Sequence, residues 1–455
     1  MKKLLTIILI LISDMVFCQT NPAITKWLFN LTGITGRHYV TGNPVPISDA
    51  TLANVQQVRY SSTDAYINAT GIPTYITGPY ALGVSSVALN NNYIFKIPLN
   101  PVANTGTLTN VGMGSVAVFI NGTVAYNNRD AASYNNAGKW HQNAVYFENL
   151  GFDCAHGHPG PMTSDYHVHQ NPTAFNISLI PMSSICNVYL ADGLYVPDST
   201  QHGPLLGFAS DGFPIYGAYG YSDPLDSLSP IKRIIPGYHL RNITSRTTLP
   251  DGTSAVGPNF TDMITSMLPG STPLPATLGA YSEDFEFING SGDLDEHNGR
   301  FCITPDYPNG MYCYFTTIDS LGNPVFPYIL GATYYGVAPA GGPGASFVHA
   351  TVPGGVISYV PPSNDIKLIK DKDLDVTIFS SAANDILVIQ SNISQPYDRT
   401  VDLINVEGKV VQKQYLYQGS TMCYFDLQTI YSGIYFVKVS GGEKSKTKKV
   451  LIGVN

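Results

Sequence analysis

The sequence predicts an all-β protein, with a β-rich main domain that has long loops, followed by a small C-terminal β-sandwich domain. Three observations support this fold class. Short apolar stretches are repeatedly broken by turn signals, and apolar segments with a helical period are rare. Tyrosine, glycine and proline are abundant, with 30, 43 and 32 residues among 455. This combination is typical of loop-rich β proteins.

Residues 1–18 are predicted to be a signal peptide. Two lysines after Met1 precede an apolar stretch that is too short to anchor the chain in a bilayer. Cleavage after Cys18 would leave Gln19 as the first residue of the mature protein. A lipoprotein role for Cys18 is the weaker alternative because the bulky Phe17 precedes it. No other segment is apolar for long enough to span a membrane, so we expect no transmembrane segment.

The main domain is expected over residues 19–362. Residues 115–126 and 205–216 each consist of two apolar segments around a turn dipeptide, Asn121-Gly122 and Asp211-Gly212 respectively, and such pairs predict β-hairpins. A turn or two of helix is expected over residues 263–268, where Pro269 would stop it.

A tail domain is expected over residues 375–455, after a linker over residues 363–374 that follows Gly/Pro-rich stretches. Five apolar segments occur in the tail at the regular spacing of a small sandwich: residues 375–379, 386–389, 401–404, 422–425 and 434–439. The tail contains no histidine, so any histidine-based chemistry belongs to the main domain.

Charge and motifs exclude several classes of function. The net charge is −8, only 12% of residues are charged, and the single lysine-rich run at residues 444–449 reads as a solvated tail, so no nucleic-acid partner is expected. The main domain has no Gly-x-Ser-x-Gly elbow, no His-Glu-x-x-His motif and no phosphate-binding loop in a suitable setting. A conventional hydrolase or kinase is therefore disfavoured, and no organic cofactor is evident.

The cysteine pattern favours disulfides over a metal–thiolate site. The mature chain would keep five cysteines: Cys154, Cys186, Cys302, Cys313 and Cys423. Export makes disulfides plausible, and the four cysteines of the main domain permit three connectivities, among which the sequence does not choose. Cys302 and Cys313 bracket a predicted hairpin and could cross-link it. Zinc–thiolate binding is the weaker alternative because no Cys-x-x-Cys spacing occurs.

Four of the ten histidines lie between residues 154 and 172, where His156, His158, His167 and His169 form two His-x-His pairs. If His167 and His169 lie on a β-strand, their side chains point to the same face, so both imidazoles can reach one cation. Imidazole is a ligand for zinc and copper, and the neighbouring Asp165 could complete or orient the ligand set. The window therefore predicts a divalent transition-metal site, with zinc or copper as the suspected ion.

Plainer interpretations stay open for the same residues. An isolated histidine is usually a half-buried, hydrogen-bonded side chain, and His156 and His158 lie among glycines and prolines that indicate a loop of unknown direction. Asp211 is first of all a turn residue, with a ligand or acid–base role as the alternative.

The tail resembles the C-terminal sorting domain of proteins exported by the type IX secretion system of Bacteroidota. The resemblance rests on three segments: residues 383–389, 401–411 and 432–437. Ser380-Ser-Ala-Ala383 replaces the usual Pro-Asn-Pro start. The resemblance implies contact with the type IX secretion machinery, passage across the outer membrane, and a secreted or cell-surface location after signal-peptide cleavage.

The main domain resembles the YHYH domain family, whose Tyr-His-Tyr-His signature stands here as Tyr166-His167-Val168-His169. Four further stretches match, so that the resemblance covers about residues 90–336: residues 140–147, 206–217, 294–299 and 327–331. These motifs add four further candidate site residues: His141, Asp211, Asp295 and His297. A second aromatic and histidine stretch common in the family reads Tyr312-Cys313-Tyr314-Phe315 here, and His297 stands where many relatives have cysteine. The resemblance identifies the domain without supplying a reaction.

Two functions of different class follow. The first is a secreted or cell-surface protein that binds a transition metal through the histidine cluster, with its status as an enzyme left open. The alternative is an extracellular module that binds a glycan, another polymer or a small molecule through tyrosine and asparagine side chains, without a metal.

Overall fold

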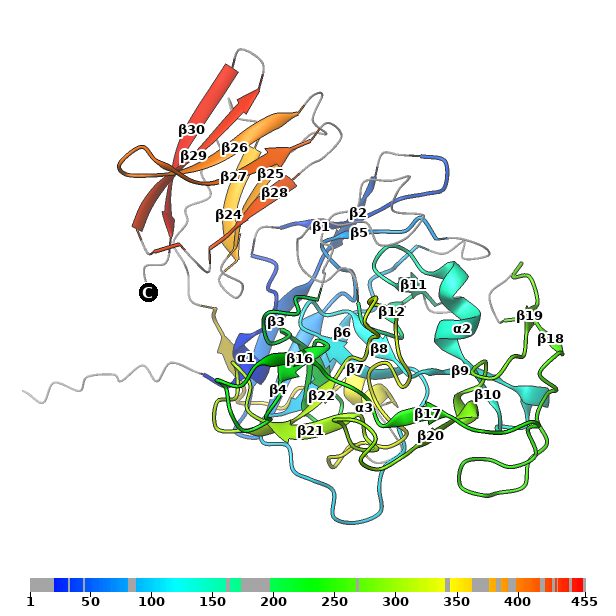
Figure 1. Cartoon of the computed structure of the whole chain (residues 1–455). Coiled ribbons are helices and arrows are strands. Elements are labelled where there is room, and N and C mark those ends of the chain that lie inside the picture. Colours follow the sequence, from blue (N-terminus) through cyan, green and yellow to red (C-terminus); the bar gives the residue numbers. More distant parts are fainter. Residues whose placement is uncertain are drawn as a thin grey trace, which may run out of the picture.

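The computed structural model describes the following residues: 20–31, 33–43, 46–80, 87–160, 164–172, 197–266, 270–339, 344–361, 376–381, 386–391, 398–417, 422–427, 430–431, 433–441 and 444–452. The predicted signal peptide, the predicted linker and Cys186 lie outside these ranges. Strands provide most of the regular structure and the helices are short, which confirms the all-β fold class (Figure 1). The described part of the chain contains no helix that is long and apolar enough to cross a membrane.

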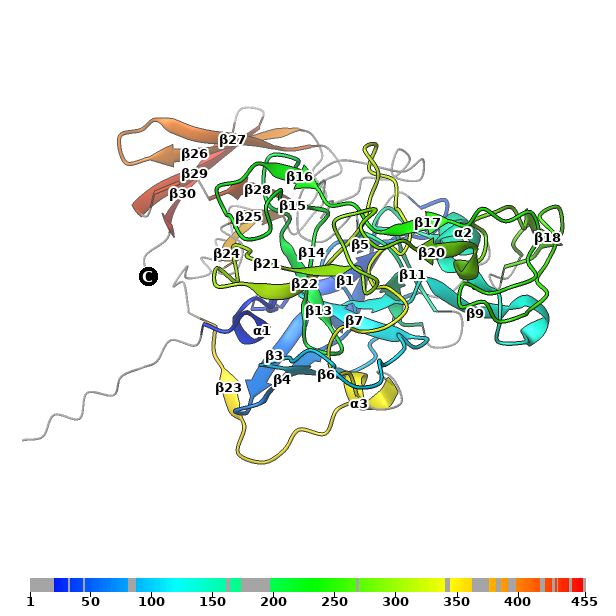
Figure 2. The ribbon, with the colours of Figure 1, turned by 60° about the horizontal axis from the view of Figure 1, so that its bottom comes forward.

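The centre of the main domain is an eight-stranded sheet with the order β11-β12-β8-β7-β13-β14-β22-β21 (Figures 1 and 2). Its strands are β7 (Ser115–Phe119), β8 (Val124–Tyr126), β11 (Gly157–Pro159), β12 (Tyr166–Val168), β13 (Leu205–Ala209), β14 (Pro214–Tyr216), β21 (Gly299–Cys302) and β22 (Met311–Phe315). Both predicted hairpins are confirmed, since β7 pairs with β8 and β13 pairs with β14 in antiparallel fashion. Gly122 and Gly212 take positive φ values of 83° and 93° in their turns, which glycine adopts without a steric penalty.

A second sheet, of order β23-β3-β4-β6, contributes to the same hydrophobic core. Its strands are β3 (Val55–Tyr60), β4 (Asp64–Ala69), β6 (Tyr93–Pro98) and β23 (Ile357–Tyr359). Val58, Ile67 and Phe95 of this sheet are fully buried in one cluster with Val118 and Phe208 of the large sheet. All five residues of β13 are buried, as expected for a strand covered on both faces.

Short helices and small sheets complete the main domain. The helices are α1 (Pro22–Thr25), α2 (Ala144–Glu148) and α3 (Gly344–Val348), with 3-10 turns η1 (Tyr134–Asn136), η2 (Asn149–Gly151) and η3 (Ser282–Asp284). The three-stranded sheet has the order β2-β1-β5, with β1 (Thr35–His38), β2 (Ile47–Leu52) and β5 (Ile76–Thr77). The two-stranded sheets pair β9 (Arg129–Ser133) with β10 (His141–Asn143), β15 (Tyr219–Tyr221) with β16 (Ile231–Arg233), β17 (Tyr238–Leu240) with β20 (Phe285–Phe287), and β18 (Met263–Ile264) with β19 (Leu274–Pro275).

The tail forms two further antiparallel sheets with their own hydrophobic cluster, as expected for a small sandwich. The first has the order β24-β25-β28, with β24 (Val376–Ser381), β25 (Ile386–Ser391) and β28 (Met422–Asp426). The second has the order β27-β26-β29-β30, with β26 (Arg399–Asn405), β27 (Val410–Leu416), β29 (Gly433–Gly441) and β30 (Lys444–Ile452). Leu387, Val401 and Val437 are fully buried in this cluster.

Two local expectations are wrong. The helical turn expected from Met263 onward is instead the strand β18, because Met263 and Ile264 pair with Pro275 and Leu274 across a hairpin. Cys302 and Cys313, which bracket the predicted hairpin, are free thiols rather than a cross-link. The strand register explains why: Cys302 lies opposite Met311, and Cys313 lies opposite Arg300, so the two cysteines are diagonal neighbours.

Candidate metal centre

Four buried side chains converge in the main domain: Glu148, His158, His167 and His169. Each offers one ligand atom, and these four atoms all lie within 4.8 Å of one another. Three of the four are histidines of the window that the sequence singled out.

The hairpin of β11 and β12 brings the imidazoles together. His158 and His167 are direct partners across the two antiparallel strands, where side chains stand close on the same face. Their ring centroids are 4.6 Å apart, and the ring of His169, which directly follows β12, lies 5.0 Å from that of His167. Tyr166 and Val168 alternate to the other side and join the hydrophobic core.

Glu148, the last residue of α2, contributes the fourth ligand atom. Its Oε2 lies 3.1 Å from Nε2 of His158 and 3.2 Å from Nε2 of His169. These are ion-pair distances without hydrogen-bond geometry, and all three atoms are buried with no hydrogen-bond partner. Buried polar atoms almost always have a partner, so this convergence of orphaned atoms calls for an explanation.

Backbone carbonyls orient two of the rings. Nδ1–H of His167 donates to the carbonyl of Asp165 at 2.9 Å, and Nδ1–H of His169 donates to the carbonyl of Asn127 at 2.6 Å. Because a carbonyl only accepts, Nδ1 of both rings must carry the proton. In a neutral imidazole the lone pair then sits on Nε2, the nitrogen left to bind an ion, and such outer-shell bonds are typical of metal-ligating histidines.

Tyr126 and Asp165 support His167 from the side. The ring of Tyr126 stacks on that of His167, with centroids 4.0 Å apart and an angle of 19° between the planes. The Tyr126 hydroxyl donates to the carboxylate of Asp165, whose backbone carbonyl holds the same histidine. Asp165 therefore lies beside the cluster, whereas its carboxylate is not one of the four converging ligand atoms.

The pKa values of the clustered side chains shift in different directions. Burial alone would raise the pKa of Glu148, but His169 and His158 outweigh it and hold that pKa well below its usual range. Burial alone would lower the pKa of His169, yet Glu148 raises it. For His167, burial first and repulsion from the other two rings second push the pKa well below its usual range. The site thus combines an ionised carboxylate with at least one neutral imidazole, a state suited to a cation.

Asp130 adds a second acidic group beside Glu148. Burial, followed by repulsion from Glu148, raises the pKa of the Asp130 carboxyl to about 7. Its Oδ2 is buried without a hydrogen-bond partner.

The structure does not bring His156, Asp211 or Asp295 into this group. His156 has a positive φ of 63°, its ring bonds to the backbone of Asn171, and burial lowers its pKa to about 4. The Asp211 carboxylate accepts hydrogen bonds from the Tyr314 hydroxyl at 2.6 Å and from the Gly336 N–H at 2.9 Å.

Asp295 and His297 have hydrogen-bond partners outside the group of four converging residues. The Asp295 carboxylate accepts from the backbone N–H of His297 at 3.0 Å and from the Tyr312 hydroxyl at 2.8 Å. Nδ1 of His297 lies 3.0 Å from the carbonyl and 2.9 Å from the hydroxyl of Thr333.

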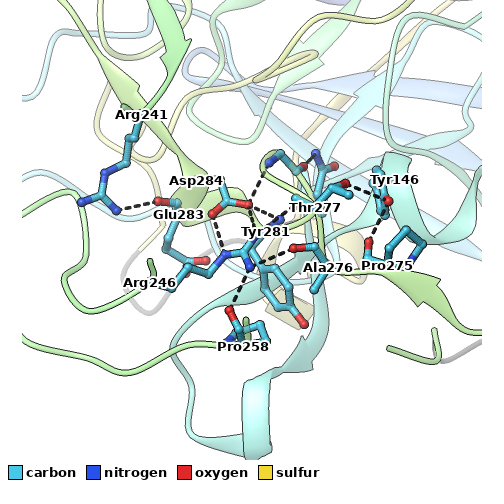
Figure 3. A network of polar contacts seen from close by, with 12 residues as sticks. Tyr146, Arg241, Arg246, Pro258, Pro275, Ala276, Thr277, Tyr281, Glu283 and Asp284 are labelled. Atoms are coloured by element: carbon cyan, nitrogen blue, oxygen red, sulfur yellow. Dashed lines mark hydrogen bonds and ion pairs between the residues drawn. The ribbon is translucent and has the colours of Figure 1, made fainter. Parts of the chain in front are cut away.

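His141 belongs to a different polar network. Its Nδ1 lies 2.6 Å from Oε1 of Glu283, the neighbour of Asp284. Figure 3 shows Asp284 facing Arg246, which it binds through two contacts of 2.7 and 2.6 Å while both side chains are fully buried. Arg246 also donates to the carbonyls of Pro258 and Ala276. His141 thus lies in a polar network of loops, apart from the four converging residues.

Glu148 was not among the site residues predicted from the sequence. It comes from a five-residue helix outside the histidine window, and one glutamate there has no distinctive spacing. The only available signal was its position directly after the matching stretch at residues 140–147.

No curated protein matches the chain. Among solved structures, a DUF3244 family protein with an immunoglobulin-like β-sandwich fold from Bacteroides vulgatus is similar over 18% of this chain and 88% of its own, at 15% identity and a TM-score of 0.16.

Two family models match separate parts of the chain. The model described as a secretion system C-terminal sorting domain matches residues 377–453, which places the protein at the cell surface or outside the cell, with the secretion machinery as a partner. The model described as YHYH protein matches residues 94–327, slightly more than half of the chain, and this region includes all four converging residues. The chain therefore belongs to the YHYH protein family.

Proposed function

We propose that this secreted or cell-surface YHYH protein binds one divalent transition-metal ion through Glu148, His158, His167 and His169. The observation that supports this most is the convergence of four buried donors, three of which have ligand atoms without any hydrogen-bond partner. An unsatisfied buried polar group costs about 1–3 kcal/mol, and more when it is charged. A cation at the centre would satisfy all of these atoms together.

The donor set fits zinc or copper. Imidazole suits both ions, and zinc takes nitrogen and carboxylate oxygen ligands at about 2.0–2.2 Å. Ligand atoms within 4.8 Å of one another need only small side-chain movements to reach such distances. The carbonyl-held rings of His167 and His169 would present Nε2 to the ion.

A metal in this site would have four protein ligands. Structural zinc sites are usually closed in this way, whereas catalytic sites keep a position for water. The proposal is therefore metal binding, with no reaction attached to it.

No specific observation favours the glycan-binding alternative. The tyrosines that suggested it include a large buried group, for example Tyr75, Tyr166, Tyr216 and Tyr314, each at most 2% exposed. Their hydroxyls are hydrogen-bonded inside the protein, for example Tyr166 to Asp153 and Tyr314 to Asp211. Core packing thus accounts for much of the tyrosine content.

Elemental analysis of the full chain tests the proposal. The protein is stripped with a chelator, reconstituted separately with Zn²⁺ and Cu²⁺, and its metal content is measured by mass spectrometry after gel filtration. We expect one ion per chain, and loss of that ion in the double variant H167A/H169A. His239→Ala is the matched control, because His239 is exposed and bonds only to Ser291 among the described contacts.

Two outcomes would overturn the proposal. One is a reconstituted wild-type protein that retains no stoichiometric metal. The other is a double variant that binds the ion as tightly as the His239→Ala control while keeping a native circular dichroism spectrum.

A further inference from the structure

The eight-stranded sheet is built from two similar halves. β7 and β13 pair antiparallel at its centre, and on either side the order of strands is repeated outward: β8, β12, β11 on one side and β14, β22, β21 on the other. The directions match as well. β12 is parallel to β8 as β22 is parallel to β14, and the outermost pair is antiparallel in both halves.

Hydrogen bonds in the two outer hairpins repeat residue by residue. In the first half, the Asp153 carboxylate accepts from the backbone N–H of residues two and four positions later and from the Tyr166 hydroxyl. In the second half, the Asp295 carboxylate accepts from the N–H of residues at the same two spacings and from the Tyr312 hydroxyl. Asp153 therefore corresponds to Asp295, and Tyr166 to Tyr312.

This correspondence locates the counterpart of the metal centre. The pair His158 and His167 across β11 and β12 corresponds to the pair Arg300 and Cys313 across β21 and β22. The first half thus has two imidazoles at these positions, whereas the second half has a guanidinium and a thiol.

Three sulfur-containing side chains share one face of the second hairpin. Cys302 lies directly opposite Met311, and Cys313 follows Met311 by two residues, so all three point to the same side. Cys302 and Cys313 are fully buried, and the Cys313 thiol donates to the backbone carbonyl of Met311 at 3.4 Å. Met311 packs against the main core from a partly buried position.

The diagonal placement suits a bridging ion better than a disulfide. Diagonal neighbours in an antiparallel pair lie about 7–8 Å apart, and cysteines whose Cα atoms are more than about 7 Å apart need backbone movement to form a disulfide. A metal ion spans a wider gap, because each metal–sulfur bond is about 2.3 Å long.

We propose that Cys302, Cys313 and Met311 form a second metal site, selective for a soft monovalent ion such as Cu⁺. Thiolate and thioether ligands select Cu⁺, whereas the first half offers nitrogen and oxygen ligands. On binding, each cysteine loses its S–H proton to solvent, two copper–sulfur bonds form with the thiolates, the thioether donates a third pair, and copper stays monovalent. One negative charge remains on the two thiolates and the ion.

Arg300 is placed to balance that charge. Its guanidinium interacts with the Cys302 side chain and lies 5.4 Å above the Phe315 ring. Its Nε is buried without a hydrogen-bond partner, although Nη2 donates to the carbonyl of Tyr221. Arg300 would thus offset the one negative charge of the two thiolates and the ion.

Anaerobic titration of the reduced full chain with Cu⁺, against a colorimetric Cu⁺ chelator, tests this second site. The imidazole centre is first filled with Zn²⁺, and binding is followed by sulfur-to-copper charge-transfer absorption. We expect one tightly bound Cu⁺ per chain. Cys302→Ser and Cys313→Ser should each weaken binding by more than the roughly 10–100-fold that loss of an outer-shell partner costs, and Met311→Leu by less. Cys423→Ser, which removes the buried thiol of the tail, should change nothing.

X-ray absorption of the Cu⁺-loaded wild type keeps the test independent of how the variants fold. A shell of two or three sulfur atoms supports the site, whereas a shell of nitrogen alone overturns it. A disulfide between Cys302 and Cys313 in unreduced peptide maps would also overturn it. Since H167A/H169A should retain this Cu⁺, failure here is distinguishable from failure of the imidazole centre.

Discussion

At the scale of single residues, Tyr126 connects His167 of the candidate metal centre to Asp165. It stacks on His167 while its hydroxyl bonds to Asp165. We expect Tyr126→Phe to keep the stacking but release Asp165, and so to weaken Zn²⁺ binding by about tenfold, as for other outer-shell changes. Competition with a fluorescent zinc chelator measures this. Tyr435→Phe is the control, since the Tyr435 hydroxyl donates to the carbonyl of Tyr431 in the tail, away from the four converging residues. Equal affinities in the two variants would contradict the supporting role.

Asp211 gives a pH dependence at the same scale. Burial raises the pKa of its carboxyl to about 6 against the lowering effect of its hydrogen bonds. Because this pKa is above the unfolded value of about 3.9, the folded state holds the proton more tightly. The resulting stability is fully present below about pH 4 and is lost as the pH rises through about 6.

The test compares urea unfolding of the wild type with Asp211→Asn from pH 4 to pH 7. We expect the free energy of unfolding of the wild type to fall by up to about 3 kcal/mol relative to the variant, which cannot ionise. A difference that stays constant across this range would show that Asp211 does not titrate there.

Single residues also show what the sequence can and cannot predict. His167 and His169 share a face through the two-residue period of a strand, which any reader of the sequence can apply. Glu148 reaches the same point only because α2 packs beside the hairpin, and no local pattern encodes that contact. His156 has a left-handed backbone conformation, and the neighbouring sequence does not predict it.

At the scale of elements, the β7–β8 hairpin positions the centre, because β8 pairs with β12 and places Val124 beside His167. Gly122 turns this hairpin with φ of 83°, and an added Cβ would lie 2.6 Å from Cβ of Ala69. Gly252 has the same φ but nothing within 4 Å of an added Cβ. Gly252→Ala should therefore cost about 1 kcal/mol from backbone strain alone, and Gly122→Ala about 1–3 kcal/mol more from overpacking. Urea unfolding of the two variants measures the difference, and equal losses would rule out the packing contribution.

Turn dipeptides predicted both central hairpins because Asn-Gly and Asp-Gly act locally. The parallel pairing of β8 with β12 was beyond such reasoning, since the strands are about 40 residues apart and register between distant strands depends on the whole core. The helical turn predicted from Met263 onward was wrong because a short apolar run is compatible with either a helix or a strand. Only the pairing with Leu274 and Pro275 decides between the two.

At the scale of the whole molecule, metal binding and export should be separable, because the described tail residues bury their own cluster and the four converging residues all lie in the YHYH region. Deleting residues 375–455 should abolish delivery to the cell surface or medium in a host that has this secretion system, while the retained protein still takes up one Zn²⁺. The full-length H167A/H169A variant should show the reverse, with normal export and no metal. Cell fractionation measures the export of both proteins, and elemental analysis measures their Zn²⁺ content.

Two outcomes would contradict this separation. A truncated protein that folds by circular dichroism but takes up no Zn²⁺ would mean that the tail helps to shape the candidate metal centre. Failed export of the full-length variant would mean that passage across the outer membrane depends on the bound ion.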